Sequence, residues 1–143
     1  MKTLKLTRDV YEQLIKSAEN EFPLEACGLL AGKNAQVESF YPVTNAEKSS
    51  TRYFMEPGEQ FQAYKQLRRE GLEVVGIWHS HPFTPPRLSE EDYRMAYMPG
   101  VIYVILSLAP GFERQLRAFK RMQEGNFEEQ EIEIVDRREA HWN

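Results

Sequence analysis

The sequence is poor in cysteine, and Cys27 is the only one among its 143 residues. A single thiol excludes an intrachain disulfide framework and a structural zinc site closed by several cysteines. The chain also lacks an apolar run near the ~20 residues that span a bilayer. Its first residues, Met1–Lys5, begin a strand-like alternation rather than a signal peptide. These absences predict a cytoplasmic protein with no membrane partner.

The chain has no excess of positive charge. Its formal net charge is −4 and its isoelectric point is about 5.5, which argues against nucleic-acid binding. The basic cluster of Lys65, Arg68 and Arg69 is typical of the solvated face of a helix. A hydrophobic content of 41% predicts a single domain spanning 1–143 with its own core. The charged tail 136–143 is expected to be frayed.

Histidine is also scarce, yet two of the three histidines lie in one short segment, His79-Ser80-His81-Pro82. This segment follows Glu73–Trp78, a nearly continuous apolar run that predicts a buried strand. Side chains at i and i+2 of an extended chain point to the same face, with Cα atoms roughly 6–7 Å apart. One metal ion between the two imidazoles is therefore geometrically easy where the chain leaves this strand.

Ser89 and Asp92 follow the histidines after a short gap. Ser89 suits the N-cap of a helix, which places Asp92 in the first helical turn, where its carboxylate can turn back toward the strand. The same pair fits a capping box that serves the helix alone, and the two roles are compatible. Two neutral imidazoles, one carboxylate and a vacant fourth position describe a catalytic zinc site.

Glu25 is the candidate for proton transfer. It stands just before an apolar, glycine-containing segment that reads as a strand entering the core, where a side chain can face a cleft. A glutamate hydrogen-bonded to zinc-bound water could accept its proton and later deliver it to a leaving amine. The competing interpretation is a solvated surface carboxylate. Cys27 reads as a small buried hydrophobic residue rather than a nucleophile or ligand.

Taken together, these residues resemble the JAMM (MPN+) motif of the Mov34/MPN/PAD-1, or JAB-domain, zinc metalloproteases. The resemblance rests on Glu25, on Cys27-Gly28-Leu29-Leu30, on Gly76-Ile77-Trp78-His79-Ser80-His81-Pro82, and on Ser89 and Asp92. It implies that His79, His81 and Asp92 bind one zinc ion per chain. It further implies that Glu25 positions and activates water and that Ser89 stabilises the tetrahedral intermediate. The chain is similar to the compact prokaryotic members of this family.

The resemblance also carries expectations about fold and substrate. It implies a single-domain α/β fold of the JAMM/MPN type, cytidine-deaminase-like, with a mixed central β-sheet flanked by helices. It implies a metallopeptidase that cleaves at the Gly-Gly C-terminus of a small ubiquitin-like or sulfur-carrier protein, releasing cysteine or a short extension. Two alternatives stay open: a general deubiquitinase, and a non-catalytic MPN-type binding or scaffold module without the metal.

Other protein families that use a His-x-His motif are excluded by chain length or by particular residues. A cupin needs a glutamate a few residues later, where Pro86 and Arg87 stand. An amidohydrolase barrel needs about 250 residues. A zinc deaminase needs a pair of cysteines that this chain does not have.

Apolar periodicity, caps and turn residues predict the remaining elements. Strands are expected around Leu4 and Leu6 and at Cys27–Lys33, Gln36–Tyr41, Arg52–Met55, Val101–Leu108, Gln115–Met122 and Phe127–Val135. Helices are expected from an Asp9 cap to Asn20, from Pro57 to about Arg69 with Phe61, Tyr64 and Leu67 inward, and over Glu90–Met98. Polar Thr44–Ser50 and proline-rich Pro82–Leu88 are expected to be loops.

Overall fold

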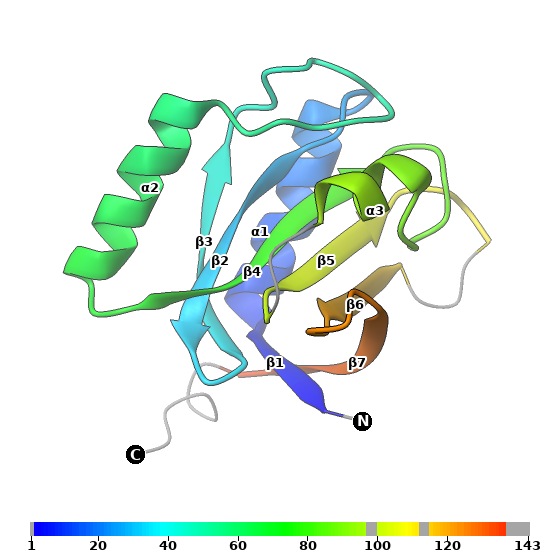
Figure 1. Ribbon diagram of the computed structural model, residues 1–143. Coiled ribbons are helices and arrows are strands. Elements are labelled where there is room, and N and C mark those ends of the chain that lie inside the picture. The colour runs from blue at the N-terminus through cyan, green and yellow to red at the C-terminus, as the bar shows by residue number, and fades with distance from the viewer. Residues whose placement is uncertain (1, 97–99, 112–114, 137–143) are drawn as a thin grey trace.

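Seven strands and three helices form along the described residues, 2–96, 100–111 and 115–136 of a computed structural model (Figure 1). The strands are β1 (Thr3–Thr7), β2 (Cys27–Lys33), β3 (Gln36–Val43), β4 (Glu73–His81), β5 (Ile102–Ser107), β6 (Leu116–Arg121) and β7 (Phe127–Val135). The helices are α1 (Arg8–Glu21), α2 (Pro57–Arg69) and α3 (Glu90–Met95). None of these helices is both long enough and apolar enough to cross a bilayer.

The strands form one mixed sheet that closes on itself in the order β1-β3-β2-β4-β5-β6-β7. Closure comes from β1, which runs parallel to β7 and pairs Leu4 with Ile132 and Leu6 with Ile134. Strand β4, which carries the two histidines, pairs antiparallel with β2 and parallel with β5. The expectation of a mixed sheet with helices is confirmed, although the sheet is a closed barrel rather than an open central layer. The likeness to cytidine deaminases stays a prediction.

The larger core lies between α1 and the inner face of the closed sheet. Every strand contributes an apolar side chain to it, and Trp78 of β4 is the largest that is fully buried. Trp78 meets Phe40 of β3 edge to face, with ring centroids 5.3 Å apart. The helix contributes the buried side chains of Val10, Leu14 and Ala18. This packing fixes which face of β4 is turned inward.

A second core lies on the opposite face of the sheet, beneath α2 (Figure 1). Ala63 and Leu67 are the buried residues of this helix. The prediction that Phe61 points inward is wrong, because its side chain is 61% exposed. Phe61 precedes Ala63 by two residues, about 200° around a helix, so it lies on the solvent side, where Lys65 covers its ring. The basic cluster is exposed, as predicted.

Several predicted boundaries differ from the structure. Thr7, not Asp9, caps α1, because its Oγ1 accepts a hydrogen bond from the Val10 N–H at 3.3 Å; Asp9 lies in the first turn, where its charge favours the helix dipole. Strand β3 continues past Tyr41 to Val43. Helix α3 ends at Met95, and residues 97 and 98 of its predicted extent lie outside the described residues, as does the tail after residue 136.

The predicted strand Arg52–Met55 is absent. This segment makes only an isolated bridge, between Asn45 and Met55. Its backbone instead bonds to a side chain, since the Arg52 carbonyl and the Phe54 N–H both pair with Asn45. The segment 44–56 is therefore a loop, held by the Asn45 amide together with backbone bonds from Ala46 to Phe54 and from Glu56 to Thr44.

Candidate metal centre

The pleat of β4 sorts its last four residues onto two faces. The strand includes both histidines rather than ending before them at Trp78, which corrects the predicted boundary. Trp78 and Ser80 face the α1 side, where the Ser80 Oγ accepts the Ala26 N–H at 2.8 Å. His79 and His81 alternate with them, so they face the other side, as side chains at i and i+2 must. Both imidazoles are at least 98% buried.

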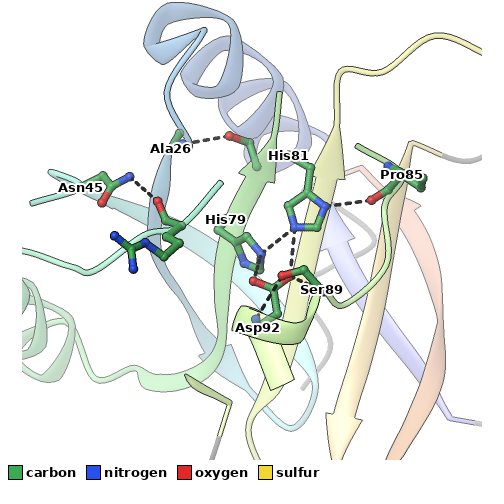
Figure 2. A network of polar contacts seen from close by, with 9 residues as sticks. Ala26, Asn45, His79, His81, Pro85, Ser89 and Asp92 are labelled. Carbon is green, nitrogen blue, oxygen red and sulfur yellow. Dashed lines mark hydrogen bonds and ion pairs between the residues drawn. The ribbon is translucent and has the colours of Figure 1, made fainter. Parts of the chain in front are cut away.

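Helix α3 brings the third candidate ligand, Asp92. Ser89 is its N-cap and forms a reciprocal capping box with Asp92: the Ser89 Oγ accepts the Asp92 N–H at 3.1 Å, and Asp92 Oδ2 accepts the Ser89 N–H at 2.9 Å. The same carboxylate turns toward β4 (Figure 2). Capping and contact with the histidines therefore occur together, as the sequence analysis allowed.

Three ligand atoms converge at one point. Asp92 Oδ1 lies 3.0 Å from His79 Nε2, Asp92 Oδ2 lies 2.9 Å from His81 Nε2, and the two Nε2 atoms are 3.2 Å apart. Ligands bound to a tetrahedral zinc at about 2.0–2.1 Å lie roughly 3.3 Å from one another, so the spacing fits one such ion. These residues form a group that can hold a metal.

Protons alone cannot satisfy these contacts. Each Nε2 offers a single in-plane proton or lone pair but has two partners. If both imidazoles donate to Asp92, two N–H groups face each other across 3.2 Å. A cation accepts all three lone pairs at once, so the donor set suits a metal better than a hydrogen-bond network.

The surroundings orient both imidazoles. His81 Nδ1 donates to the Pro85 carbonyl at 2.8 Å, which leaves the lone pair on Nε2. His79 Nδ1 has no hydrogen-bond partner among the described residues, and Tyr53 stacks on this ring at 4.5 Å between centroids. Burial lowers the pKa of His79, and Asp92 only partly opposes this effect.

The carboxyl of Asp92 stays ionised despite its burial. Burial alone would raise its pKa, but the contacts with His79, followed by those with His81 and the Ser89 N–H, hold the pKa well below its ordinary value. Charge-assisted contacts of this kind are stronger than neutral ones. An anion is thus present at the point where a cation would bind.

Glu25 is buried, not a solvated surface carboxylate. Its side chain is 2% exposed, and its Oε1 has no hydrogen-bond partner among the described residues. Burial, followed by the charge of Asp92, raises the pKa of Glu25 from 4.5 to about 9. A divalent cation held by the nearby cluster would favour its ionised form. The influence of Asp92 on this pKa indicates that the Glu25 carboxyl lies close enough to the cluster to feel its charge.

Three further groups contact the candidate ligands or the backbone of Glu25, and the sequence patterns did not predict them: Tyr53, Asn45 and the carbonyl of Pro85. Each acts through a loop conformation, which periodicity and caps do not predict. The contact of Ser80 was predictable from strand alternation. That alternation turns its side chain away from the histidines and toward Ala26. Cys27 is buried and its thiol donates to the Val43 carbonyl, in agreement with the predicted structural role.

Comparison with known proteins agrees with this geometry. Residues 7–121 match the family described as prokaryotic homologs of the JAB domain. The CysO-cysteine peptidase of Mycobacterium tuberculosis is 31% identical over 135 residues, which cover 93% of this chain and 92% of that protein. The desampylase of Haloferax volcanii is 32% identical over 111 residues, 73% of this chain and 80% of that protein. Protein DSY2949 of Desulfitobacterium hafniense, solved in solution, has a TM-score of 0.84 and 34% identity, covering 97% of this chain and 99% of that one.

A mixed sheet flanked by helices, in which one strand presents two histidines to an aspartate of the next helix, is the arrangement of this chain, and its fold is that of a JAB/MPN domain. This chain belongs to the prokaryotic JAB family. The resemblance seen in the sequence is confirmed.

The raised pKa of Glu25 predicts how the metal-free chain responds to pH. Between pH 4.5 and about 9 the unfolded chain has this carboxyl ionised while the folded chain keeps it protonated, so its contribution to stability falls as pH rises. Glu25→Gln removes this loss. We expect the melting temperature of the variant to exceed that of the parent at pH 8 in chelator, with the difference shrinking toward pH 4.

Circular-dichroism melts at several pH values measure this difference, with Glu19→Gln on the exposed side of α1 as the control. A difference between Glu25→Gln and the parent that stays constant from pH 4 to pH 8 would contradict the burial of an uncharged Glu25.

Proposed function

We propose that this chain is a zinc-dependent metallopeptidase, formed by one domain over 1–143. Its substrate bond is a peptide or isopeptide bond at the Gly-Gly C-terminus of a small ubiquitin-like or sulfur-carrier protein. The observation that carries the proposal is the convergence of His79, His81 and Asp92 within electrostatic reach of the buried Glu25. The lone cysteine supports a cytoplasmic setting.

His79, His81 and Asp92 would hold the ion, and three protein ligands leave a position open, as catalytic zinc sites do. When bound there, zinc supplies a Lewis acid for the scissile carbonyl and lowers the pKa of a water molecule to about 7. Glu25 takes a proton from the attacking water and passes it to the leaving nitrogen. The Ser89 Oγ accepts from the Asp92 N–H, so its own proton remains to donate to the developing oxyanion.

The exposed surface beside the site supports a protein-sized substrate. Phe22 and Phe83 are 48% and 59% exposed and meet edge to face, with centroids 5.2 Å apart. They lie three residues before Glu25 and two residues after His81, at the border of the site. Exposed aromatic pairs are costly in isolation and are common where another protein docks.

The substrate class rests on the relatives. The proteins named CysO-cysteine peptidase and desampylase share most of their length with this chain. Glycine suits a narrow cleft, because it has no side chain to meet the walls. The proline-rich loop after His81 would form one such wall, and its Pro85 carbonyl is already fixed by His81.

The ligand set predicts one zinc ion per chain, removed by chelator. His79→Ala and Asp92→Ala are each expected to abolish binding, because two remaining ligands cannot hold the ion. Elemental analysis of dialysed protein measures the ratio, and Glu90→Ala, an exposed acid in the same turn of α3, is the matched control that keeps zinc. Occupancy should also fall in acid as the ligands protonate. Full occupancy in both ligand variants would refute the site.

Catalysis and metal binding should separate at Glu25. Glu25→Gln is expected to keep zinc and fold while kcat falls about 10²–10⁴-fold, the usual effect of losing a general base. Ser89→Ala should lower kcat by about 10²-fold, as when one oxyanion donor is removed, with an added loss of capping stability. Steady-state kinetics on the zinc-loaded variants test this. A Glu25→Gln variant as active as the parent would exclude the mechanism.

The proposed specificity predicts release of cysteine from CysO whose Gly-Gly C-terminus carries one cysteine. Changing either glycine to valine should abolish most of the cleavage, because a branched side chain would clash with the cleft. Mass spectrometry of the carrier follows the reaction, with casein as an unfolded control and diubiquitin as a second conjugate. Cleavage of diubiquitin in preference to CysO would favour the general deubiquitinase. Broad cleavage of casein with no effect of the glycine changes would reject the specificity.

A further inference from the structure

One buried amide outside the metal cluster has all its hydrogen-bonding capacity in use. The Asn45 side chain is 5% exposed and lies in the loop 44–56. Its Nδ2 donates to the carbonyls of Glu25 at 3.1 Å and Arg52 at 3.0 Å. Its Oδ1 accepts the N–H groups of Glu47 and Phe54, each at 3.0 Å. An amide has two donors and two acceptor lone pairs, so each of them has a partner.

The first of these bonds fixes the backbone of the proposed base. The Glu25 carbonyl accepts from Asn45, and the Glu25 N–H donates to the Ser49 carbonyl at 2.8 Å. The next N–H, that of Ala26, is bound by the Ser80 Oγ of β4. Both peptide planes that flank Glu25 are therefore held. The Oε1 of its side chain has no partner among the described residues, so its position depends on this backbone.

The other bonds hold the residue that packs on the ligand His79. The Arg52 carbonyl and the Phe54 N–H flank Tyr53 on either side, and both bind the Asn45 amide. Tyr53 stacks on His79 with an angle of 21° between the rings. Figure 2 shows Asn45 on the side of His79 away from His81. A single side chain thus connects the backbone of Glu25 with the platform beneath a metal ligand.

We propose that Asn45 is a positioning residue that sets the Glu25 carboxylate relative to the metal ligands. The inference rests on the proposed function, in which Glu25 is the base. Only an amide satisfies all four groups: aspartate would set its negative oxygens against the Glu25 and Arg52 carbonyls, and alanine would leave the buried Glu25 carbonyl and three part-buried backbone groups without this partner. Asn45 touches neither substrate nor metal in this role, so it acts through Glu25.

The kinetic test is a double-mutant cycle with zinc-loaded protein and CysO bearing a C-terminal cysteine. Asn45→Ala is expected to lower kcat about 10–10²-fold, the effect of misplacing a reacting group by about 1 Å, with KM changed less than about 3-fold and zinc retained. In the Glu25→Gln background the same change should cost less than about 3-fold, because no base remains to misplace. Equal losses in both backgrounds would overturn the proposal.

Two controls separate positioning from loss of stability. Val37→Ala opens a cavity in the core beneath α1 and should lower the melting temperature without a change in kcat. Asn45→Asp keeps the volume and both acceptor bonds but loses the donor to Glu25, so it should show the kcat loss even if Asn45→Ala fails to fold. Parental kcat in a folded Asn45→Asp variant would refute the proposal.

A readout without substrate distinguishes this proposal from the proposed function. Crystal structures of zinc-loaded parent and Asn45→Asp should show the Glu25 carboxylate displaced by about 1 Å or disordered, with the three ligand atoms in place. An unmoved carboxylate overturns the role of Asn45 whatever the activity. A displaced carboxylate in a chain that cleaves no carrier supports the role and refutes the function instead.

Discussion

The site depends on the alternation of side chains along β4. Trp78 anchors the strand in the core, and Ser80 ties it to Ala26, so the intervening and following histidines must point the other way. Pairing with β2 on one edge and β5 on the other continues to the histidines, with Cys27 opposite His79 and Ser107 opposite His81. A slip of one residue would turn the histidines into the apolar core and Trp78 toward the candidate metal position. The pairing of β4 with β2 and β5 therefore also determines which way the candidate ligands His79 and His81 point.

The cluster is electrostatically incomplete without a cation. The pKa values of two buried carboxyl groups are shifted in opposite directions. The histidines keep the pKa of Asp92 low, while burial and Asp92 raise the pKa of Glu25 to about 9. A buried acid without a hydrogen-bond partner, as at the Glu25 Oε1, destabilises a fold. Its presence here is consistent with a site shaped for a bound ion, since polar groups that weaken a fold concentrate where function requires them.

The sequence predicted the parts of the site that obey local rules. Strand alternation gives His79 and His81 one face, and an N-cap serine places Asp92 in a first turn, so local rules predicted that these three candidate ligands could meet. The rest depends on contacts between distant segments. Leu4 pairs with Ile132 to close the barrel, and no pattern in either strand specifies that partner. The prediction that Phe61 points inward was wrong for a related reason. The apolar character of a residue does not show which side of its helix packs against the rest of the protein.

The loop 44–56 marks the limit of pattern-based reasoning most clearly. The segment 52–55 has the β-propensity of a strand, yet its backbone groups bind a side chain ten residues or fewer away. Asn45 competes with strand pairing because its amide offers the same donors and acceptors as a peptide group. The ligands therefore stand on rigid strand and helix ends, while the proposed base is aligned by a loop. Changes in the loop can alter alignment without removing a ligand, whereas changes in β4 affect the core and the ligands together.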